Sequence, residues 1–304
     1  MPSTLPPAPF GRMLTAMVTP FAADGSLDLD QAQRLATHLV DHGHDGLVVL
    51  GTTGESPTVT DSEAARLLAA VVEAVGDRAS VVAGVGTNAT EHTLELAAQA
   101  EKVDVDALLV VTPYYNRPPQ KGLVAHFTAV ADATGLPVML YDIPARTGTK
   151  IGAETFARVA AHDRIVAVKD ATGDLVGGSW VMEHTGLAYY SGDDAMNLAW
   201  LTHGAAGLVS VVGHVAGDDY AAMIRAVDTG DLLAARAIQR RLLPAVDAIM
   251  NRTQGAIMTK AALQLQGVLV ERTVRLPLVE ATTAQIDELR ADLAAAGLLE
   301  DSTA

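Results

Sequence analysis

The feature that most constrains this chain is a regular alternation of short apolar runs with segments of helical periodicity, from Met13 to Val211. Short apolar runs that are rich in β-branched residues and end in turn residues predict strands buried on both faces. The eight expected strands are Met13–Val18, Gly46–Leu50, Ser80–Ala83, Ala107–Val111, Pro137–Tyr141, Ile165–Lys169, Ala188–Tyr190 and Gly207–Val211. The helices expected between them are Leu29–His42, a helix from the capping box Thr60-Asp61-Ser62-Glu63 to Val75, Thr90–Lys102, Gly122–Thr134, Thr155–His162, Gly177–His184 and Asp194–Thr202.

This pattern predicts an α/β protein built as a parallel (β/α)8 TIM barrel. A doubly wound open sheet is the main alternative, but no Gly-x-Gly-x-x-Gly motif opens the first unit, which disfavours its dinucleotide-binding version. From about Ala221 we expect helices alone, at Ala221–Val227, Leu232–Met250, Ala256–Leu265 and Ala284–Ala296. Thr283 is the expected N-cap of the last helix, and Pro244 should kink or divide the second. The sequence thus predicts a barrel with the active site over residues 1–220 and a C-terminal all-helical domain over residues 221–304.

Composition excludes several classes of function. The 304 residues carry a net charge of −15 and are only 4% aromatic, so the chain lacks the basic field and stacking side chains of a nucleic-acid-binding protein. It has no cysteine, which excludes disulfides, thiolate catalysis and cysteine-based zinc sites. The proline-rich start, Met1 to Phe10, does not resemble a signal peptide, and no apolar stretch is long enough to span a bilayer. We expect a cytoplasmic protein with no membrane partner.

Lys169 is the most informative single residue. It ends the apolar run Ile165–Val168 and is followed by a turn-like segment that contains Asp170 and Asp174. Burying an ammonium group is costly, and a lysine avoids that cost by losing its proton, which makes its amine a nucleophile toward carbonyls. On this stretch alone, a lysine that reaches solvent and pairs with Asp170 or Asp174 is the more common outcome.

Other unusual polar residues also come just after expected strands. They are Gly51-Thr52-Thr53-Gly54 after the second strand, Pro113–Asn116 after the fourth, Tyr141–Gly148 at the end of the fifth and Ser191–Asp194 after the seventh. In a (β/α)8 barrel these strand ends all open onto the face that carries the active site. Their convergence there favours a catalytic role for Lys169 over a structural one.

These groups are sufficient for Schiff-base chemistry. A neutral Lys169 can condense with a ketone to give an iminium, which acidifies the neighbouring carbon and yields an enamine. The turn at Thr52 and Thr53 offers N–H groups and hydroxyls to a carboxylate. Tyr141 can move protons to and from the carbonyl oxygen, and Arg146 can clamp a carboxylate. Taken singly, each also has an ordinary explanation: a plain turn, a core tyrosine or a solvated arginine.

We expect no metal site. His42 and His44 come between the first helix and the second strand, at the opposite face of the barrel, and no His-Glu-x-x-His pattern supports them. Asp193 and Asp194 offer oxygen ligands to a divalent ion, but the cap of the helix that follows is the simpler role.

Together, the motifs Thr15–Phe21, Gly51–Glu55, Pro113–Tyr115, Tyr141–Gly148 and Val168–Asp170 resemble those of the pyruvate-dependent class I aldolases of the N-acetylneuraminate lyase superfamily. Within it they are most similar to the 4-hydroxy-tetrahydrodipicolinate (dihydrodipicolinate) synthases. The resemblance implies a lyase that condenses pyruvate with L-aspartate 4-semialdehyde to 4-hydroxy-tetrahydrodipicolinate, on the route to diaminopimelate and lysine. It also implies that no metal or organic cofactor is needed.

The resemblance implies a catalytic role for four residues. Lys169 would form the Schiff base with pyruvate. Tyr141 would transfer protons and would be linked through Thr52 to Tyr115, which in the family reaches in from a neighbouring subunit. The family is usually a homotetramer, assembled as a dimer of dimers, which suits a proton path that crosses subunits.

Four further residues are expected to bind substrate. Thr53 and its turn would hold the pyruvate carboxylate, with the backbone carbonyl of Val209 and Gly192 in the same pocket. Arg146 would bind the carboxylate of L-aspartate 4-semialdehyde at the mouth of the site.

Thr52 and Arg146 distinguish this chain from sister activities. N-acetylneuraminate lyases usually carry Ser at the position of Thr52 and lack an arginine at that of Arg146, and sugar-acid aldolases also tend to lack it. Another pyruvate-dependent aldolase, a pyruvate-binding regulator without turnover and a metal-dependent aldolase remain the alternatives. Asp142 stands where the family often has Asn, which we take as tolerated.

Regulation by L-lysine is the last point on which the resemblance bears. The inhibitor pocket of feedback-inhibited members should lie near Ser56, Asp61, Ala64, Asn88, His92 and Tyr114. Inhibited members commonly have histidines near the first helix positions and a glutamate at the position of His92. Asp61, Ala64 and His92 depart from that pattern, so we expect weak or absent inhibition.

Overall fold

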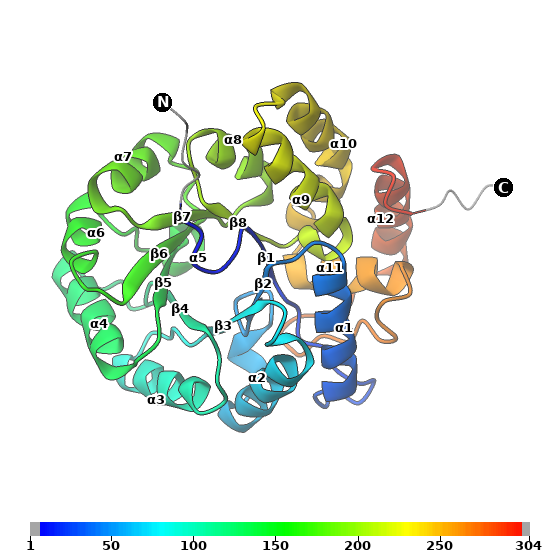
Figure 1. Cartoon of the computed structure of the whole chain (residues 1–304). Coiled ribbons are helices and arrows are strands. Elements are labelled where there is room, and N and C mark those ends of the chain that lie inside the picture. Colours follow the sequence, from blue (N-terminus) through cyan, green and yellow to red (C-terminus); the bar gives the residue numbers. More distant parts are fainter. Residues whose placement is uncertain (1–6, 300–304) are drawn as a thin grey trace.

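The structure, a computed structural model, is a closed barrel of parallel strands surrounded by helices (Figure 1). It describes residues 7–299, so the first six residues of the proline-rich start lie outside the described residues. The strands are β1 Met13–Ala16, β2 Gly46–Val49, β3 Ser80–Gly84, β4 Ala107–Val111, β5 Val138–Asp142, β6 Ile165–Asp170, β7 Ala188–Ser191 and β8 Gly207–Ser210. Each strand pairs with the next in the sequence, and β8 closes the ring on β1. The predicted barrel is confirmed, and the open-sheet alternative is wrong.

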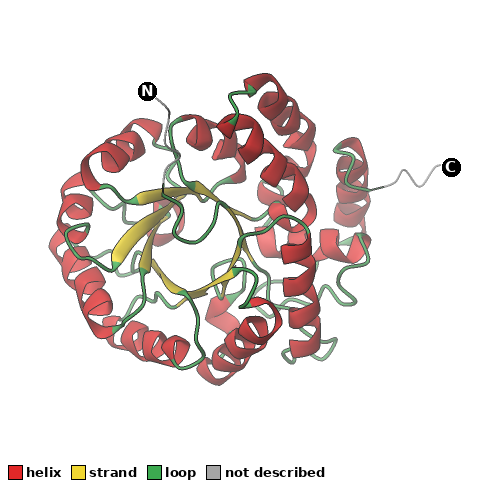
Figure 2. Ribbon diagram, in the orientation of Figure 1, coloured by secondary structure: helices red, strands yellow, loops and turns green. Residues whose placement is uncertain are grey.

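Helices cover the outside of this ring, as Figure 2 shows. The helices between the strands are α1 Leu29–Asp41, α2 Asp61–Val75, α3 Thr90–Glu101, α4 Gln120–Ala133, α5 Pro144–Thr147, α6 Ala153–Val159, α7 Leu175–Thr185 and α8 Asn197–Thr202. Two short 3-10 helices, η1 Ser56–Thr58 and η2 Asp194–Met196, precede α2 and α8. The remaining helices are α9 Gly213–Asp228, α10 Leu232–Met250, α11 Gly255–Leu265 and α12 Thr283–Ala295.

Both faces of every strand are buried, which explains the unbroken apolar runs. On β5, Val138 and Leu140 pack outward against the helices, whereas Met139 and Tyr141 point into the barrel. Successive side chains of a strand alternate between its two faces, so one strand serves both cores. The interior core is small and closed, and it ends at the carboxyl ends of the strands, where the polar residues begin.

The structure corrects several expected element boundaries. Helix α9 spans Gly213–Asp228 with a kink at Ala216 (φ −136°, ψ 32°), so helical structure begins before the expected Ala221. Helix α10 runs through Pro244 as one undivided helix. The N-cap of α12 is Thr282, not Thr283, because its hydroxyl accepts the N–H of Gln285 in a capping box. The capping box of α2, with Thr60 as N-cap and Glu63 at its third position, is confirmed.

Helices α10, α11 and α12 gather on one side of the barrel, next to α9 and α1 (Figure 1). Helix α10 packs against α9 and α12, and α11 packs against α9, α10 and α12. The C-terminal segment also reaches the barrel directly, since Gln31 of α1 donates a hydrogen bond of 3.0 Å to the carbonyl of Val268. This contact places the segment after α11 beside the first β/α units.

Candidate active site

Lys169 lies on β6 and points into the barrel with a side chain that is almost fully buried. Lys169 is 3% exposed. Ala167, two residues earlier on the same face of β6, belongs to the interior core of the barrel. The register partners of Lys169 on the two neighbouring strands are Tyr141 and Tyr190. A Cβ atom added at Gly192 would lie 3.0 Å from Cε and Cγ of Lys169, so the glycine leaves room for the lysine chain.

Among the described residues, Lys169 has no carboxylate within ion-pair distance. Asp170 accepts hydrogen bonds from the Tyr189 hydroxyl at 2.6 Å and the Thr172 N–H at 2.8 Å, and Asp174 pairs with Lys150 at 2.6 Å. The structural explanation, in which Lys169 pairs with Asp170 or Asp174, is therefore wrong. Burial lowers the pKa of Lys169 to about 8, although the Asp194 charge opposes the shift. An amine with this pKa is partly neutral near pH 7 and available as a nucleophile.

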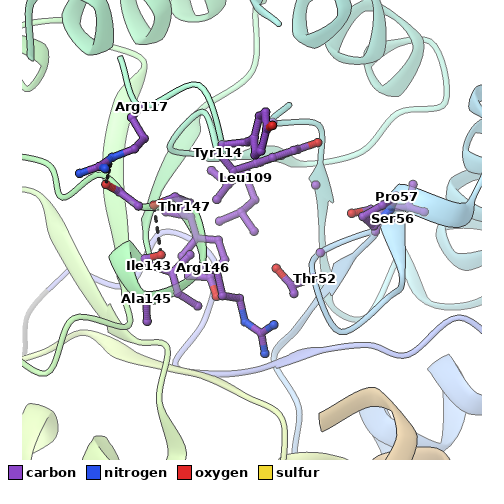
Figure 3. Close-up of a pocket in the computed structure, with 18 residues that line it drawn as sticks. Thr52, Ser56, Pro57, Leu109, Tyr114, Arg117, Ile143, Ala145, Arg146 and Thr147 are labelled. Carbon is purple, nitrogen blue, oxygen red and sulfur yellow. Dashed lines mark hydrogen bonds between the residues drawn. The ribbon is translucent and has the colours of Figure 1, made fainter. Parts of the chain in front are cut away.

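A pocket of about 430 Å³ opens at the carboxyl ends of the strands (Figure 3). Loops after β2, β4 and β5 line it, and they bring together four of the predicted residues: Thr52, Tyr115, Tyr141 and Arg146. Tyr141 connects the pocket to the lysine, because its ring centroid lies 4.1 Å from Lys169 Nζ. The other four predicted residues do not line this pocket: Lys169, Thr53, Gly192 and Val209.

Tyr141 is buried at the floor of this pocket. Burial raises the pKa of its hydroxyl, and the Arg146 cation and the Thr52 hydroxyl oppose that rise. The phenol therefore stays protonated at neutral pH and can donate a hydrogen bond or a proton to an oxygen bound in front of it.

Arg146 is exposed at the rim, on the single-turn helix α5. Pro144 opens this helix, and Gly148 ends it with a φ of 76°, a conformation that glycine adopts without strain. The guanidinium of Arg146 extends into the pocket on the side where Thr52 lies (Figure 3). Arg117, which sequence reasoning missed, donates from Nε to the carbonyl of Gly148 at 3.1 Å and so supports this loop.

The turn that carries Thr52 and Thr53 is held in an unusual backbone conformation. Leu50 and Glu55, on either side of it, have φ values of 63° and 55°, in the left-handed region that non-glycine residues rarely adopt. A Cβ at Gly54 would lie 3.1 Å from the carbonyl oxygen of Met17, so only glycine fits this close approach without rearrangement.

The end of β8 does not line this pocket. Val209 is buried in the interior core, and its strand runs beside β1. Asp194 fixes the backbone that follows, because its carboxylate accepts the N–H groups of Val211 at 2.8 Å and Val212 at 3.0 Å. Asp193 provides the expected cap, with Oδ1 accepting the N–H of Ala195 at 3.1 Å. The role of Asp194 is tertiary, so no local pattern in the sequence indicated it.

Tyr115 is the most exposed of the predicted catalytic residues, at 89%. Its φ of 73° is also in the left-handed region, and its N–H donates to the carbonyl of Thr147 at 3.3 Å. A large aromatic side chain held outward by strained backbone is well placed to contact another molecule.

The histidines near the other end of the barrel are structural. His44 is buried between Thr15 Oγ1 and the carbonyl of Leu39, each at 2.6 Å. Over residues 7–299, no group of three or more His, Cys, Asp or Glu side chains is arranged to hold a metal ion. Within the same range, no helix combines the length and the apolarity needed to cross a membrane.

The fold and the site define a class: a (β/α)8 barrel enzyme of the class I aldolase type, with a buried lysine at the end of β6. Comparison with known proteins then gives the family. Residues 9–296 match the model of the dihydrodipicolinate synthetase family. The chain belongs to this family.

Two curated relatives and one solved structure illustrate the likeness. The 4-hydroxy-tetrahydrodipicolinate synthase of Kineococcus radiotolerans is 66% identical, over 96% of this chain and 95% of the relative. The 4-hydroxy-tetrahydrodipicolinate synthase of Acidothermus cellulolyticus is 63% identical, over 99% of this chain and 97% of the relative. The dihydrodipicolinate synthase of Cyanidioschyzon merolae, solved with lysine bound, is 42% identical, with a TM-score of 0.93 over 96% of this chain and 100% of that one.

Proposed function

We propose that this protein condenses pyruvate with L-aspartate 4-semialdehyde to 4-hydroxy-tetrahydrodipicolinate, in the biosynthesis of diaminopimelate and lysine. The single observation that carries the proposal is the buried Lys169, which has no carboxylate partner among the described residues and has its Nζ 4.1 Å from the centroid of the Tyr141 ring. The identity to synthases along nearly the whole chain supports the same reaction.

In the proposed reaction, the neutral Lys169 amine attacks the ketone carbon of pyruvate, and loss of one water gives an iminium. The iminium draws electrons from the neighbouring methyl group, so a proton leaves it and an enamine forms. The enamine carbon attacks the aldehyde carbon of the second substrate and forms the new C–C bond. The amine of that substrate then displaces Lys169 from the iminium carbon, which closes the ring and frees the enzyme.

Tyr141 is the proposed proton donor and acceptor for these steps. Its raised pKa keeps it protonated at neutral pH, so it can protonate the departing oxygen of the first adduct. The Thr52 hydroxyl lies beside it and would pass the proton on to Tyr115 of a second subunit. The exposure of Tyr115 supports its contact with a second subunit. The resemblance to the family supports a homotetramer, built as a dimer of dimers, as the functional form.

Two separate anchors for carboxylates support the order of substrates. The turn at Thr53, with Val209 and Gly192 close to Lys169, would bind the carboxylate of pyruvate deep in the site. Arg146 at the rim would bind the carboxylate of L-aspartate 4-semialdehyde. In this proposal the pyruvate anchor is the deeper of the two and the aldehyde anchor is at the rim, so the ketone substrate would bind first and the aldehyde second.

A second cavity bears on regulation. It measures about 340 Å³ and is lined by Ser56, Asp61, Ala64, Asn88, His92 and Tyr114, together with neighbouring residues. Asp61 is engaged with His92 Nε2 at 3.2 Å and so is less available to an incoming ammonium group. We propose that L-lysine binds this cavity weakly or not at all.

The reaction is tested by measuring pyruvate consumption by the purified protein against a panel of aldehydes. Turnover with L-aspartate 4-semialdehyde alone is the expected result. Turnover with N-acetylmannosamine or a sugar aldehyde instead would keep the Schiff-base chemistry but overturn the proposed substrate. Loss of activity with a chelator would favour the metal-dependent alternative.

A further inference from the structure

The turn that carries Thr52 and Thr53 is connected to the C-terminal helices by a buried ion pair. Glu55, the first residue after the turn, extends its carboxylate away from the pocket toward α11. There Oε1 lies 2.5 Å from Nζ of Lys260, a residue 205 positions later in the sequence. The side chains of Glu55 and Lys260 are 2% and 0% exposed.

Every polar atom of this pair has a partner from the C-terminal segment or the pair itself. The second carboxylate oxygen of Glu55 accepts the backbone N–H of Arg275 at 3.0 Å, and Lys260 Nζ also donates to the carbonyl of Thr273 at 2.7 Å. Lys260 Nζ lies 4.3 Å from the centroid of the Phe21 ring, and the guanidinium carbon of Arg275 lies 4.2 Å from it. The buried charges are thus compensated by a specific arrangement that requires α11 and the loop after it.

A strong link at Glu55 matters because its backbone is strained. Glu55 and Leu50 both have positive φ values, and residues in such conformations persist only when their surroundings fix them. The hydroxyl of Thr19 fixes the turn on the barrel side, by donating to the carbonyl of Gly54 at 2.6 Å. The Lys260–Glu55 pair fixes it on the other side.

We infer that Lys260 is a positioning residue for the proposed reaction: from the C-terminal helices, it holds the Glu55 end of the Thr52–Thr53 turn at the geometry that binds the pyruvate carboxylate. Without Lys260, Glu55 keeps a buried carboxylate without its cation, and the turn must move to bring that carboxylate to water. The loop of Arg146 is supported separately, by the hydrogen bond from Arg117 to Gly148. Loss of Lys260 should therefore leave Arg146, which would bind the aldehyde substrate, in place. This inference rests on the proposed function, since it concerns binding of the first substrate.

The test compares the full-length protein with Lys260→Met and with the double variant Lys260→Met/Glu55→Gln. The readouts are the pyruvate concentration that gives half-maximal borohydride-trapped adduct on Lys169, the KM values for the two substrates and the melting temperature. For Lys260→Met we expect the half-saturating pyruvate concentration to rise about tenfold to a hundredfold, because small displacements of a binding group have effects of that order. The KM for the aldehyde should stay nearly constant. The double variant should recover part of the loss, because no unpaired charge remains.

Arg252→Met is the matched control. Arg252 also belongs to the C-terminal segment, but its ion pairs are with Asp247, Glu288 and Asp292 of the same segment. This variant should lower the melting temperature without changing the half-saturating pyruvate concentration. If Lys260→Met does not fold, Glu55→Gln is the second variant, and it should show the same selective loss of pyruvate affinity.

A Lys260→Met protein that melts earlier but takes up pyruvate as the unaltered protein does would show a purely structural role and overturn the inference. The same holds for a folded Glu55→Gln protein with unchanged pyruvate affinity. Failure of the unaltered protein to form any adduct on Lys169 would instead overturn the proposed function, and this inference with it.

Discussion

The Nζ atom of Lys169 lies 4.1 Å from the centroid of the Tyr141 ring, and the two residues are register partners on the neighbouring strands β6 and β5. This arrangement places a nucleophile with a lowered pKa beside an acid with a raised pKa, and burial is the main cause of both shifts. Near neutral pH, the lowered pKa makes the Lys169 amine available as a nucleophile, and the raised pKa keeps the Tyr141 phenol protonated as an acid.

Removal of the Tyr141 hydroxyl should slow proton transfer without preventing binding. We predict that Tyr141→Phe lowers kcat by about 10²- to 10⁴-fold, the usual range for loss of a general acid–base group. Tyr190→Phe is the control: Tyr190 is the register partner of Lys169 on β7, and its hydroxyl donates to the carbonyl of Gly11 and not toward the pocket. Steady-state kinetics at saturating pyruvate make the comparison. Equal losses in the two variants would contradict the role of Tyr141.

Loss of Arg146 should affect the second substrate selectively. Arg146→Ala removes a charge-assisted contact with a carboxylate, so we predict a rise of about 10- to 100-fold in the KM for L-aspartate 4-semialdehyde. Formation of the pyruvate adduct should be nearly unchanged. Arg158→Ala, an exposed arginine of α6 outside the pocket, is the control. Unaltered aldehyde kinetics in Arg146→Ala would favour a sugar-acid aldolase.

Asp142 should make the protein less stable at higher pH. It is buried, its Oδ1 has no hydrogen-bond partner among the described residues, and burial raises its pKa from 3.8 to about 7. The unfolded chain therefore loses this proton first, and stability declines as the pH rises from about 4 to about 7. Asp142→Asn cannot ionise. At about pH 8 we expect it to be more stable by on the order of 2 to 4 kcal/mol, a gain that disappears toward pH 4.

Urea unfolding at the two pH values measures this difference. Asp163 is exposed, so Asp163→Asn serves as the control. It should change the free energy of unfolding by no more than about 0.5 kcal/mol at either pH. An Asp142→Asn protein with the same pH dependence as the unaltered chain would show that Asp142 is not the group that titrates.

L-Lysine should inhibit poorly. With His92 in place of a glutamate, and with Asp61 bonded to His92, the cavity offers little free negative charge to an ammonium group. We predict an inhibition constant above about 1 mM at neutral pH, and stronger inhibition for His92→Glu. Steady-state rates measured at increasing L-lysine concentrations give this inhibition constant. A submillimolar inhibition constant for the unaltered protein would refute the expectation.

The barrel and the grouping of its site residues could be predicted because their causes are local. Strands such as β5 are apolar on both faces, and residues at their carboxyl ends necessarily meet at one face. The start of α9 could not be predicted, because it contains glycines that serve tertiary contacts. A Cβ at Gly213 would lie 2.5 Å from Thr15 Oγ1, and one at Gly217 would lie 2.3 Å from the carbonyl oxygen of His42.

Contacts between residues far apart in the chain could not be predicted from the sequence either. Asp194 appeared to be a helix cap, yet its carboxylate binds backbone N–H groups after β8. Glu55 and Lys260 show no common pattern, because only the closed fold brings them together. Periodicity records which face of an element is buried, but it carries no information about which distant side chain will meet it.

The most direct test of the central claim is reduction of the protein with borohydride in the presence of pyruvate, followed by mass spectrometry of its peptides. We predict one pyruvate-derived adduct, on the peptide that contains Lys169, with none on the buried Lys260 and none in Lys169→Arg. We also predict that the rate of adduct formation rises as the pH approaches about 8, where the amine loses its proton. No adduct, or an adduct that persists in Lys169→Arg, would contradict the assignment of Lys169 as the Schiff-base residue.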